Sequence, residues 1–324
     1  MSTEILNVKN LSMHYETLSG TVKAVKDVSF TLNKGESFGL VGESGCGKTS
    51  VAMSLLQLQA DNAIISSGSI NLDGVELIGM SESELRSVRW SGISMVFQGA
   101  MNAWNPVVKI GEQIREAIRE HYPNNSKSQN TEKIASLFKI VGLDDSIMNR
   151  YPHELSGGMK QRAIIALALS CDPKVVIADE PTTALDVVIQ DQILTEIKKV
   201  QKLLGLSLIY ISHDIAVIAE MTNNMAVMYA GSIVELGPTS EVFSNPKHAY
   251  TRLLLESTPS VVGERKQLRS LDGEPPSLIN DITGCSFSPR CPNPSEGCRN
   301  GSVEMKLVKV GDNHYADQCC LECS

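Results

Sequence analysis

The segment of the chain most suited to chemistry is a glycine-rich run that ends in a lysine and a threonine. Residues 42–49 read Gly-Glu-Ser-Gly-Cys-Gly-Lys-Thr, which fits the phosphate-loop pattern G-x-x-x-x-G-K-[ST]. Glycines let backbone N–H groups wrap closely around phosphate oxygens at the start of a helix. We expect Lys48 to reach the outer phosphates and the Thr49 hydroxyl to hold magnesium. The residues predicted to line this site are Gly42, Ser44, Gly45, Cys46, Gly47, Lys48, Thr49 and Ser50.

A second candidate is a pair of carboxylates that follows the apolar run 175–178. A carboxylate at the C-terminal end of a parallel strand can face a magnesium ion, and we expect Asp179 to do so. We expect Glu180 to orient or polarise the attacking water, which suits phosphoryl transfer, where positioning dominates. The alternative is an ordinary strand exit before Pro181. The presence of the phosphate loop makes the functional interpretation the stronger one.

These motifs need a sheet and helices to position them, and the apolar pattern predicts both. A buried strand is expected directly before the loop, over 37–41, and a helix directly after it, over 50–59. Amphipathic helices over 110–121 and 131–141, with a polar break between them, indicate a helical insertion. Further strands are expected over residues 5–8, 24–30, 175–178, 206–211 and 226–229, with a helix over 187–204. Alternating strands and helices predict an α/β fold with a parallel sheet.

Composition narrows the class of protein. The chain has 324 residues, which corresponds to about two folded units, and a net charge of −8. Such a charge argues against a protein that neutralises the phosphates of a duplex. The longest apolar run, residues 163–169, is far shorter than the about 20 residues that cross a bilayer. The first residues lack the order of a secretory signal, so we expect a cytoplasmic chain.

Residues 155–162 read Leu-Ser-Gly-Gly-Met-Lys-Gln-Arg, which is similar to the signature L-S-G-G-Q of the ATP-binding cassette family. The resemblance covers residues 3–255 and implies ATP hydrolysis with Mg²⁺. It also implies a P-loop NTPase fold with a parallel-sheet core, an N-terminal antiparallel β subdomain and a helical subdomain at 100–165. The motifs that carry it, in the family's order, are Tyr15, the phosphate loop, Gln98, the signature, Asp179-Glu180, Asp186 and His213.

The resemblance assigns a role to each of these residues. Ser156, Gly157 and Gly158 would complete the ATP site of a partner subunit in a head-to-tail dimer, because they expose N–H groups at a helix start. Gln98 would touch magnesium and the water, and His213 would contact the γ-phosphate. Asp186 would lie at the dimer seam, and Tyr15 would stack on adenine. A satisfied strand-end histidine and simple strand packing are the alternatives for His213 and Tyr15.

Finer features are similar to the ATPases of dipeptide and oligopeptide importers. They are residues 97–106, 151–155 and 245–251, with Met159 typical of the "D" subunit. The resemblance implies a second ATPase subunit, either an identical copy or, as the resemblance favours, a paired homologue that forms a heterodimer, together with two membrane permease subunits and an extracytoplasmic substrate-binding protein. It places the chain on the cytoplasmic face of the membrane. Gly99-Ala100 and Trp104 depart from the usual pattern near Gln98, and oligosaccharides or nickel remain alternative cargoes to peptides.

Cysteines crowd the C-terminal part of the chain. The spacings that link Cys285, Cys291, Cys298 and Cys319 or Cys320 do not include the C-x2-C pair typical of structural zinc modules, although four thiolates could converge on one soft metal centre. Residues 284–292 resemble the C-terminal extension of peptide-importer ATPases, which implies a 4Fe–4S cluster on Cys285, Cys291, Cys298 and Cys319, with Cys320 as an alternative. Zinc and reduced thiols are competing interpretations. We expect a nucleotide-binding domain over 1–257, then a linker and a small irregular cysteine-rich extension over 258–324.

Two further functions belong to other classes. The first is an ATPase of the same family that acts on nucleic acid or the ribosome, which the net charge and the lack of a basic stripe disfavour. The second is a regulatory subunit without activity, which the presence of Lys48, Glu180 and His213 disfavours.

Overall fold

A computed structural model describes residues 4–183, 185–257, 272–279 and 282–319 of the chain. Within them, no helix is long and apolar enough to span a bilayer. The chain divides into two compact units, which are described separately. The first unit comprises Met1–Ile5, Leu32–Glu36 and Leu72–Ile209, and the second comprises Leu6–Thr31, Ser37–Asn71 and Tyr210–Ser324. The boundary between the units falls within strand β8 (Ser207–Ser212).

The first unit is built on two parallel strands, β6 (Ile93–Val96) and β7 (Val175–Asp179). Both strands are buried along their whole length, as expected for apolar runs that are covered on both faces. The pairing runs from Ile93 opposite Val175 to Val96 opposite Ala178. It therefore brings the segment after Val96 and the segment after Asp179 to the same edge.

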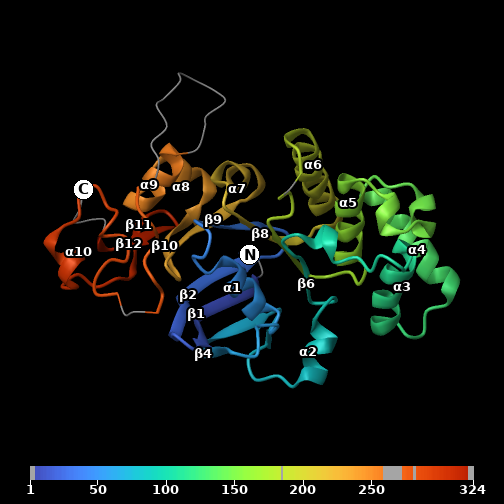
Figure 1. The fold of residues 1–324 in the computed structure, drawn as a ribbon, viewed down its shortest axis with the longest axis horizontal. Coiled ribbons are helices and arrows are strands. Elements are labelled where there is room, and N and C mark those ends of the chain that lie inside the picture. The colour runs from blue at the N-terminus through green and yellow to red at the C-terminus, as the bar shows by residue number, and fades with distance from the viewer. Residues whose placement is uncertain (1–3, 184, 258–271, 280–281, 320–324) are drawn as a thin grey trace. The chain divides into compact units, whose positions relative to one another are not determined.

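Helices occupy the rest of the first unit (Figure 1). Helix α3 (Ile110–His121) packs against α4 (Lys127–Ile140) and α5 (Gly157–Ala168), and α5 packs against β6 and α6 (Val187–Leu204). Helix α4 begins four residues earlier than the sequence predicts, because Ser126 and Gln129 form a capping box. The remaining elements are β5 (Val75–Glu76), α2 (Glu82–Val88), and the 3-10 helices η1 (Ala100–Asn102), η2 (Asp145–Asn149) and η3 (Pro152–Glu154).

The second unit contains a mixed sheet around the buried strand β3 (Ser37–Val41). Strand β9 (Asn224–Tyr229) is parallel to β3, and β10 (Ser232–Pro238) is antiparallel to β9. Helix α1 (Lys48–Leu55) follows β3, and α7 (Ile215–Met221) packs on β3. The packing is so close at Gly39 that a Cβ on this residue would lie 2.4 Å from Cγ2 of Ile218. Helices α8 (Thr239–Ser244) and α9 (Ala249–Glu256) follow β10.

Most of β1 (Glu4–Thr17), β2 (Gly20–Asn33) and β4 (Ala63–Leu72) also lies in the second unit, in the order β2-β1-β4. Only two residues connect β1 and β2, so these strands form an antiparallel hairpin. Both strands are longer than the sequence predicts, because polar residues alternate with buried ones along them. An antiparallel β subdomain is thereby confirmed.

The C-terminal extension is more regular than expected. Strand β12 (His314–Asp317) pairs antiparallel with β10 and with β11 (Leu307–Gly311), and a short helix, α10 (Glu296–Asn300), precedes them. The prediction of an irregular segment is therefore wrong for residues 307–317. These strands escape sequence analysis because they are short and half-exposed, and pairing with the edge of β10 is what orders them.

Candidate functional site

The phosphate loop joins β3 to α1 and requires glycine at two positions. Gly42 has φ +155°, and a Cβ there would lie 2.2 Å from the backbone oxygen of Met228. Gly47 has φ +107°, and a Cβ there would lie 2.2 Å from the backbone oxygen of Ala24. Neither position accepts a side chain without backbone movement. The close approach of the loop backbone to β9 and β2 therefore explains the glycines of the motif.

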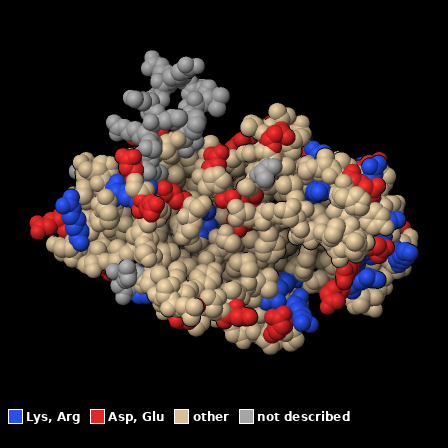
Figure 2. Space-filling view, in the orientation of Figure 1, with Lys and Arg blue, Asp and Glu red and all other residues tan. Residues whose placement is uncertain are grey.

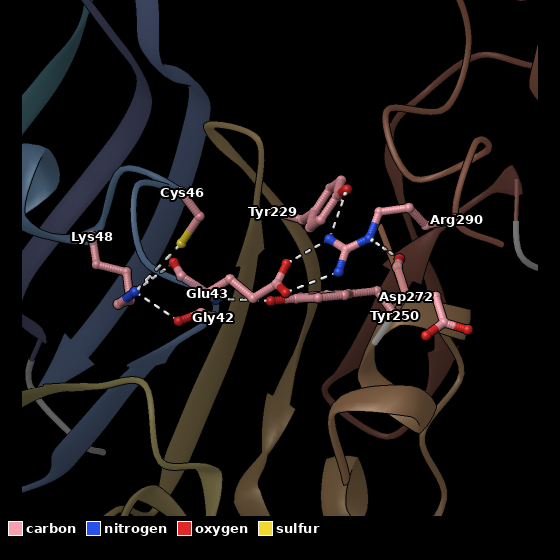
Figure 3. Close-up of polar contacts among 8 residues, drawn as sticks. All are labelled: Gly42, Glu43, Cys46, Lys48, Tyr229, Tyr250, Asp272 and Arg290. Carbon is pink, nitrogen blue, oxygen red and sulfur yellow. Dashed lines mark hydrogen bonds and ion pairs between the residues drawn. The ribbon is translucent and has the colours of Figure 1, made fainter. Parts of the chain in front are cut away.

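Lys48 lies over its own loop (Figure 3). Its Nζ donates to the backbone oxygens of Gly42 at 2.7 Å and of Glu43 at 3.0 Å, and lies 3.6 Å from Cys46 Sγ. The ammonium is thus held at the loop by hydrogen bonds to neutral acceptors. Anionic phosphate oxygens accept stronger hydrogen bonds and can replace these acceptors. Burial raises the pKa of Cys46, so its thiol stays protonated and fills space in the loop. Ser44, Gly45 and Thr49 are exposed.

In the first unit, the structure joins Gln98 to the acidic pair. Gln98 Nε2 donates to Glu180 Oε2 at 2.8 Å, and Thr183 Oγ1 donates to the same oxygen at 3.0 Å. Glu180 itself has a left-handed backbone with φ +46°, a conformation that costs about 1–3 kcal/mol and commonly marks functional positions. Asp179 is 1% exposed at the end of β7. The carboxylate of Glu180 is therefore held in one orientation by two donors, of which Thr183 was not predicted.

The signature residues lie at the start of α5. Ser156 caps the helix, because its Oγ accepts from the backbone N–H of Met159 at 3.4 Å. A Cβ on Gly158 would lie 3.1 Å from Ile189 Cγ2, so the signature packs directly against α6. Asp186 caps α6 in the same way, with Oδ1 3.0 Å from the N–H of Ile189. The signature and Asp186, 30 positions apart in the sequence, thus meet on one surface of the first unit.

The other predicted nucleotide contacts lie in the second unit. The hydroxyl of Tyr15 lies 3.1 Å from Ser50 Oγ, which links the expected adenine-stacking residue to the first turn of α1. His213 is exposed directly after β8. Both positions leave the side chains accessible to a ligand.

The cysteines of the extension form a cluster with an unexpected member. One ligand atom each from His248, Cys285 and Cys319 lies within 4.8 Å of the others, and all three residues are buried. Cys298 is also buried, and its backbone oxygen accepts from the N–H of Cys285 at 2.8 Å. Of the residues that the structure describes, Cys291 is half-buried outside this three-residue group, and Cys320 lies beyond them. The structure therefore brings Cys285 and Cys319 together with His248, a residue for which the spacing of the cysteines gives no signal.

The cluster favours a thiolate. A hydrogen bond with the Cys319 side chain, supported by His248, lowers the pKa of Cys285 from 9.0 to about 5, although burial opposes the shift. The thiolate is the form of cysteine that binds metals. Sulfur and imidazole nitrogen together suit zinc and iron–sulfur centres rather than magnesium or calcium.

Comparisons with known proteins match both parts of the chain. The model of the ABC transporter family matches residues 25–183, and that of the oligopeptide/dipeptide transporter C-terminal region matches residues 234–298. A dipeptide transport ATP-binding protein of Bacillus subtilis, DppD, is 43% identical over 293 residues, which cover 90% of this chain and 87% of that protein. An oligopeptide transport ATP-binding protein of Escherichia coli, OppD, is 42% identical over 296 residues, which cover 91% and 87%.

Solved structures agree with this match. The dimeric post-hydrolysis state of the ATP-binding cassette MJ0796, bound to ADP and Pi, superposes with a TM-score of 0.65 at 25% identity, covering 72% of this chain and 98% of that one. The ABC ATPase fold with its antiparallel β subdomain is thus common to both chains.

Proposed function

Because the chain belongs to the ATP-binding cassette transporter family, in its dipeptide and oligopeptide importer branch, we propose that it hydrolyses ATP to drive peptide uptake through separate membrane permease subunits. The observation that carries this proposal is the joint match to the ABC transporter model and to the peptide transporter C-terminal model on one chain. The chain is an ATPase subunit, and its relatives are named for dipeptide and oligopeptide transport.

The catalytic roles follow from the chemistry of each residue. Lys48 and the loop amides hold the phosphates, and Thr49, Asp179 and Gln98 are the residues that would hold Mg²⁺. Bound magnesium supplies charge neutralisation at the phosphates. Glu180 accepts the proton of the attacking water or orients it, and the two donors on its carboxylate support this role. His213 stabilises the γ-phosphate.

We assign the second half of the nucleotide site to a partner subunit. Ser156, Gly157 and Gly158 present a capped but exposed helix start, which suits an anion from another chain. Val187 and Val188, directly after Asp186, are 82% and 66% exposed. Exposed apolar side chains of this kind support an interface with the partner subunit at this surface. The solved cassette noted above is dimeric. The partner in this proposal is a paired homologous ATPase.

Permease subunits and an extracytoplasmic substrate-binding protein complete the assembly, with this chain at the cytoplasmic face of the membrane. Phe97 and Val107 are 43% and 79% exposed on either side of Gln98 and Trp104, and we assign them to the permease contact. In this way a change in the contacts of Gln98 with the bound nucleotide site can alter the contact with the permease. We also propose residues 1–257 as the nucleotide-binding domain and 258–324 as linker and extension.

Peptides are the proposed cargo. The relatives' names refer to peptides, and none of those quoted refers to oligosaccharides or nickel. Acidic and basic side chains are interspersed on the face of the described residues that Figure 2 shows, which does not favour action on nucleic acid.

The test of this function is capture and reconstitution. The tagged chain, solubilised with its membrane, should co-purify two permeases and a second ATPase. In vesicles, a mixture of short peptides with the extracytoplasmic binding protein should raise ATP turnover several-fold. Stimulation by DNA instead, lost at high salt, would identify the nucleic-acid alternative.

We further propose that the thiol cluster holds an iron–sulfur centre. Cys285, Cys298 and Cys319 are buried close together, and His248 supplies a fourth donor beside them. A bound centre would supply cross-links that a short segment otherwise lacks, since small units rarely stabilise themselves by apolar burial alone. The residues' own part is to present sulfur and nitrogen donors in a region shielded from water.

An iron–sulfur centre would give the protein a colour. Anaerobically purified protein should be brown, with broad absorbance near about 400 nm and iron bound to the chain. Cys285→Ser should remove most of both signals, whereas Cys171→Ser, in the first unit, should keep them. A colourless protein that contains zinc would show that the iron–sulfur assignment is wrong.

A further inference from the structure

An arginine of the C-terminal extension forms a two-point ion pair with the phosphate loop (Figure 3). Arg290 Nη1 lies 2.6 Å from Glu43 Oε2, and Nη2 lies 2.9 Å from Glu43 Oε1. The side chain of Arg290 is 5% exposed and that of Glu43 is 25% exposed. Paired donors of this kind are among the strongest polar contacts in proteins, and water screens this pair only weakly.

The rest of the guanidinium is fixed as well. Its Nε donates to the backbone oxygen of Asp272 at 2.9 Å, and Nη1 also donates to the hydroxyl of Tyr229 at 3.3 Å. The hydrogen bonds to Glu43 raise the pKa of Arg290 further above its usual value, so it is charged at every working pH. A buried charge held at three points cannot move without leaving partners unpaired.

Glu43 connects this ion pair to the phosphate-binding lysine. Its backbone oxygen accepts from Lys48 Nζ at 3.0 Å, and its backbone N–H donates to the hydroxyl of Tyr250 at 2.8 Å. The side chain of Glu43 therefore contacts the extension, while its backbone is part of the phosphate-binding loop (Figure 3).

The extension also supports the aromatic residues beside the loop. Phe287 meets Tyr229 edge-on at 5.2 Å between ring centroids and lies 5.4 Å from Tyr250. Both tyrosines that bond to Glu43 or Arg290 thus pack on a residue of the extension. The folded extension and the shape of the loop depend on the same contacts.

The ion pair between Arg290 and Glu43 affects how the loop binds a negatively charged ligand. A carboxylate one residue from Gly42 would repel a polyphosphate that binds in the loop. Arg290 neutralises that carboxylate and anchors it away from Lys48. A loop held in advance in one conformation also binds with a smaller loss of entropy.

We propose that Arg290 is a positioning residue for the nucleotide site, through which the folded C-terminal extension sets the affinity of the phosphate loop for ATP. Arg290 acts through Glu43. The inference rests on the proposed nucleotide site.

The experiment compares binding of a non-hydrolysable ATP analogue to full-length variants. Arg290→Ala should raise Kd about 10-fold, since it leaves Glu43 unpaired beside the phosphates. Glu43→Gln completes the double-mutant cycle, and Kd should rise less than in Arg290→Ala, because the amide oxygen still accepts from Arg290 and no free carboxylate faces the phosphates. In the double variant Glu43→Gln/Arg290→Ala the carboxylate is gone, so Kd should return to within about 3-fold of the original protein. The matched control is Arg299→Ala, an exposed arginine of the same extension.

Salt gives a second readout. The difference in Kd between Arg290→Ala and the original protein should shrink as ionic strength rises, because salt screens the repulsion between the freed carboxylate and the phosphates. The proposal is overturned if Arg290→Ala binds the analogue as tightly as the original protein, or if the double variant binds no better than Arg290→Ala. A loss of structure alone gives the second result, since removing the Glu43 charge would not restore a misfolded extension. Failure of the unaltered protein to bind would instead count against the nucleotide site itself.

Discussion

Replacing Glu180 by glutamine is expected to leave ATP binding intact and to lower ATP turnover by about 100-fold or more, the usual contribution of a positioned general base. The amide has nearly the shape of the carboxylate and can still accept from Gln98 and Thr183, so the local geometry persists. It cannot take a proton from water. The variant should therefore accumulate as an ATP-bound dimer, measurable by steady-state phosphate release and by size-exclusion chromatography with ATP.

The matched control for this variant is Glu120→Gln, an exposed glutamate of α3 in the same unit. Its turnover should stay within about 2-fold of the original, as for most surface substitutions. Unchanged phosphate release by Glu180→Gln would show that the assigned role of Glu180 is wrong, even if ATP still binds.

Replacing Lys48 by alanine has the second large expected effect, a rise in the Kd for ATP of about 10- to 100-fold, which corresponds to losing hydrogen bonds from a charged donor. Lys48 is 6% exposed and is aimed at the loop, so no other residue of the motif replaces its charge. Binding can be measured by calorimetry without turnover, at the same magnesium concentration for each protein.

The loss of Lys48 should also lower thermal stability, because the backbone oxygens of Gly42 and Glu43 lose their donor. Added ATP should protect the original protein against unfolding more than the variant, since only tight ligands shift unfolding strongly. Lys9→Ala, an exposed position on β1, provides the control. Equal ATP affinity in Lys48→Ala and Lys9→Ala would contradict the phosphate-binding role.

Local sequence patterns predicted the short buried strands well, whereas helix α1 ends at Leu55, four residues before the predicted end. The buried run 37–41 is strand β3 and the run before Asp179 is β7, because short apolar runs bounded by turn residues suit buried strands. Strands that are half-exposed were harder to predict. Strand β1 extends to Thr17, and β11 and β12 had no clear pattern, because pairing with other strands makes them strands: β1 pairs with β2 and β4, and β12 pairs with β11 and β10.

The sequence by itself determined the chemistry of the nucleotide site, since glycines, lysine and carboxylates at fixed spacing specify a phosphate loop and its acidic strand end regardless of what packs around them. Only the tertiary structure decided which distant residues support that chemistry. The contact of Gln98 with Glu180 spans 82 positions and that of Arg290 with Glu43 spans 247 positions, and His248 joins the cysteines of a segment that follows it. Spacing along the chain carries no record of such pairs, because packing of strands and helices brings them together.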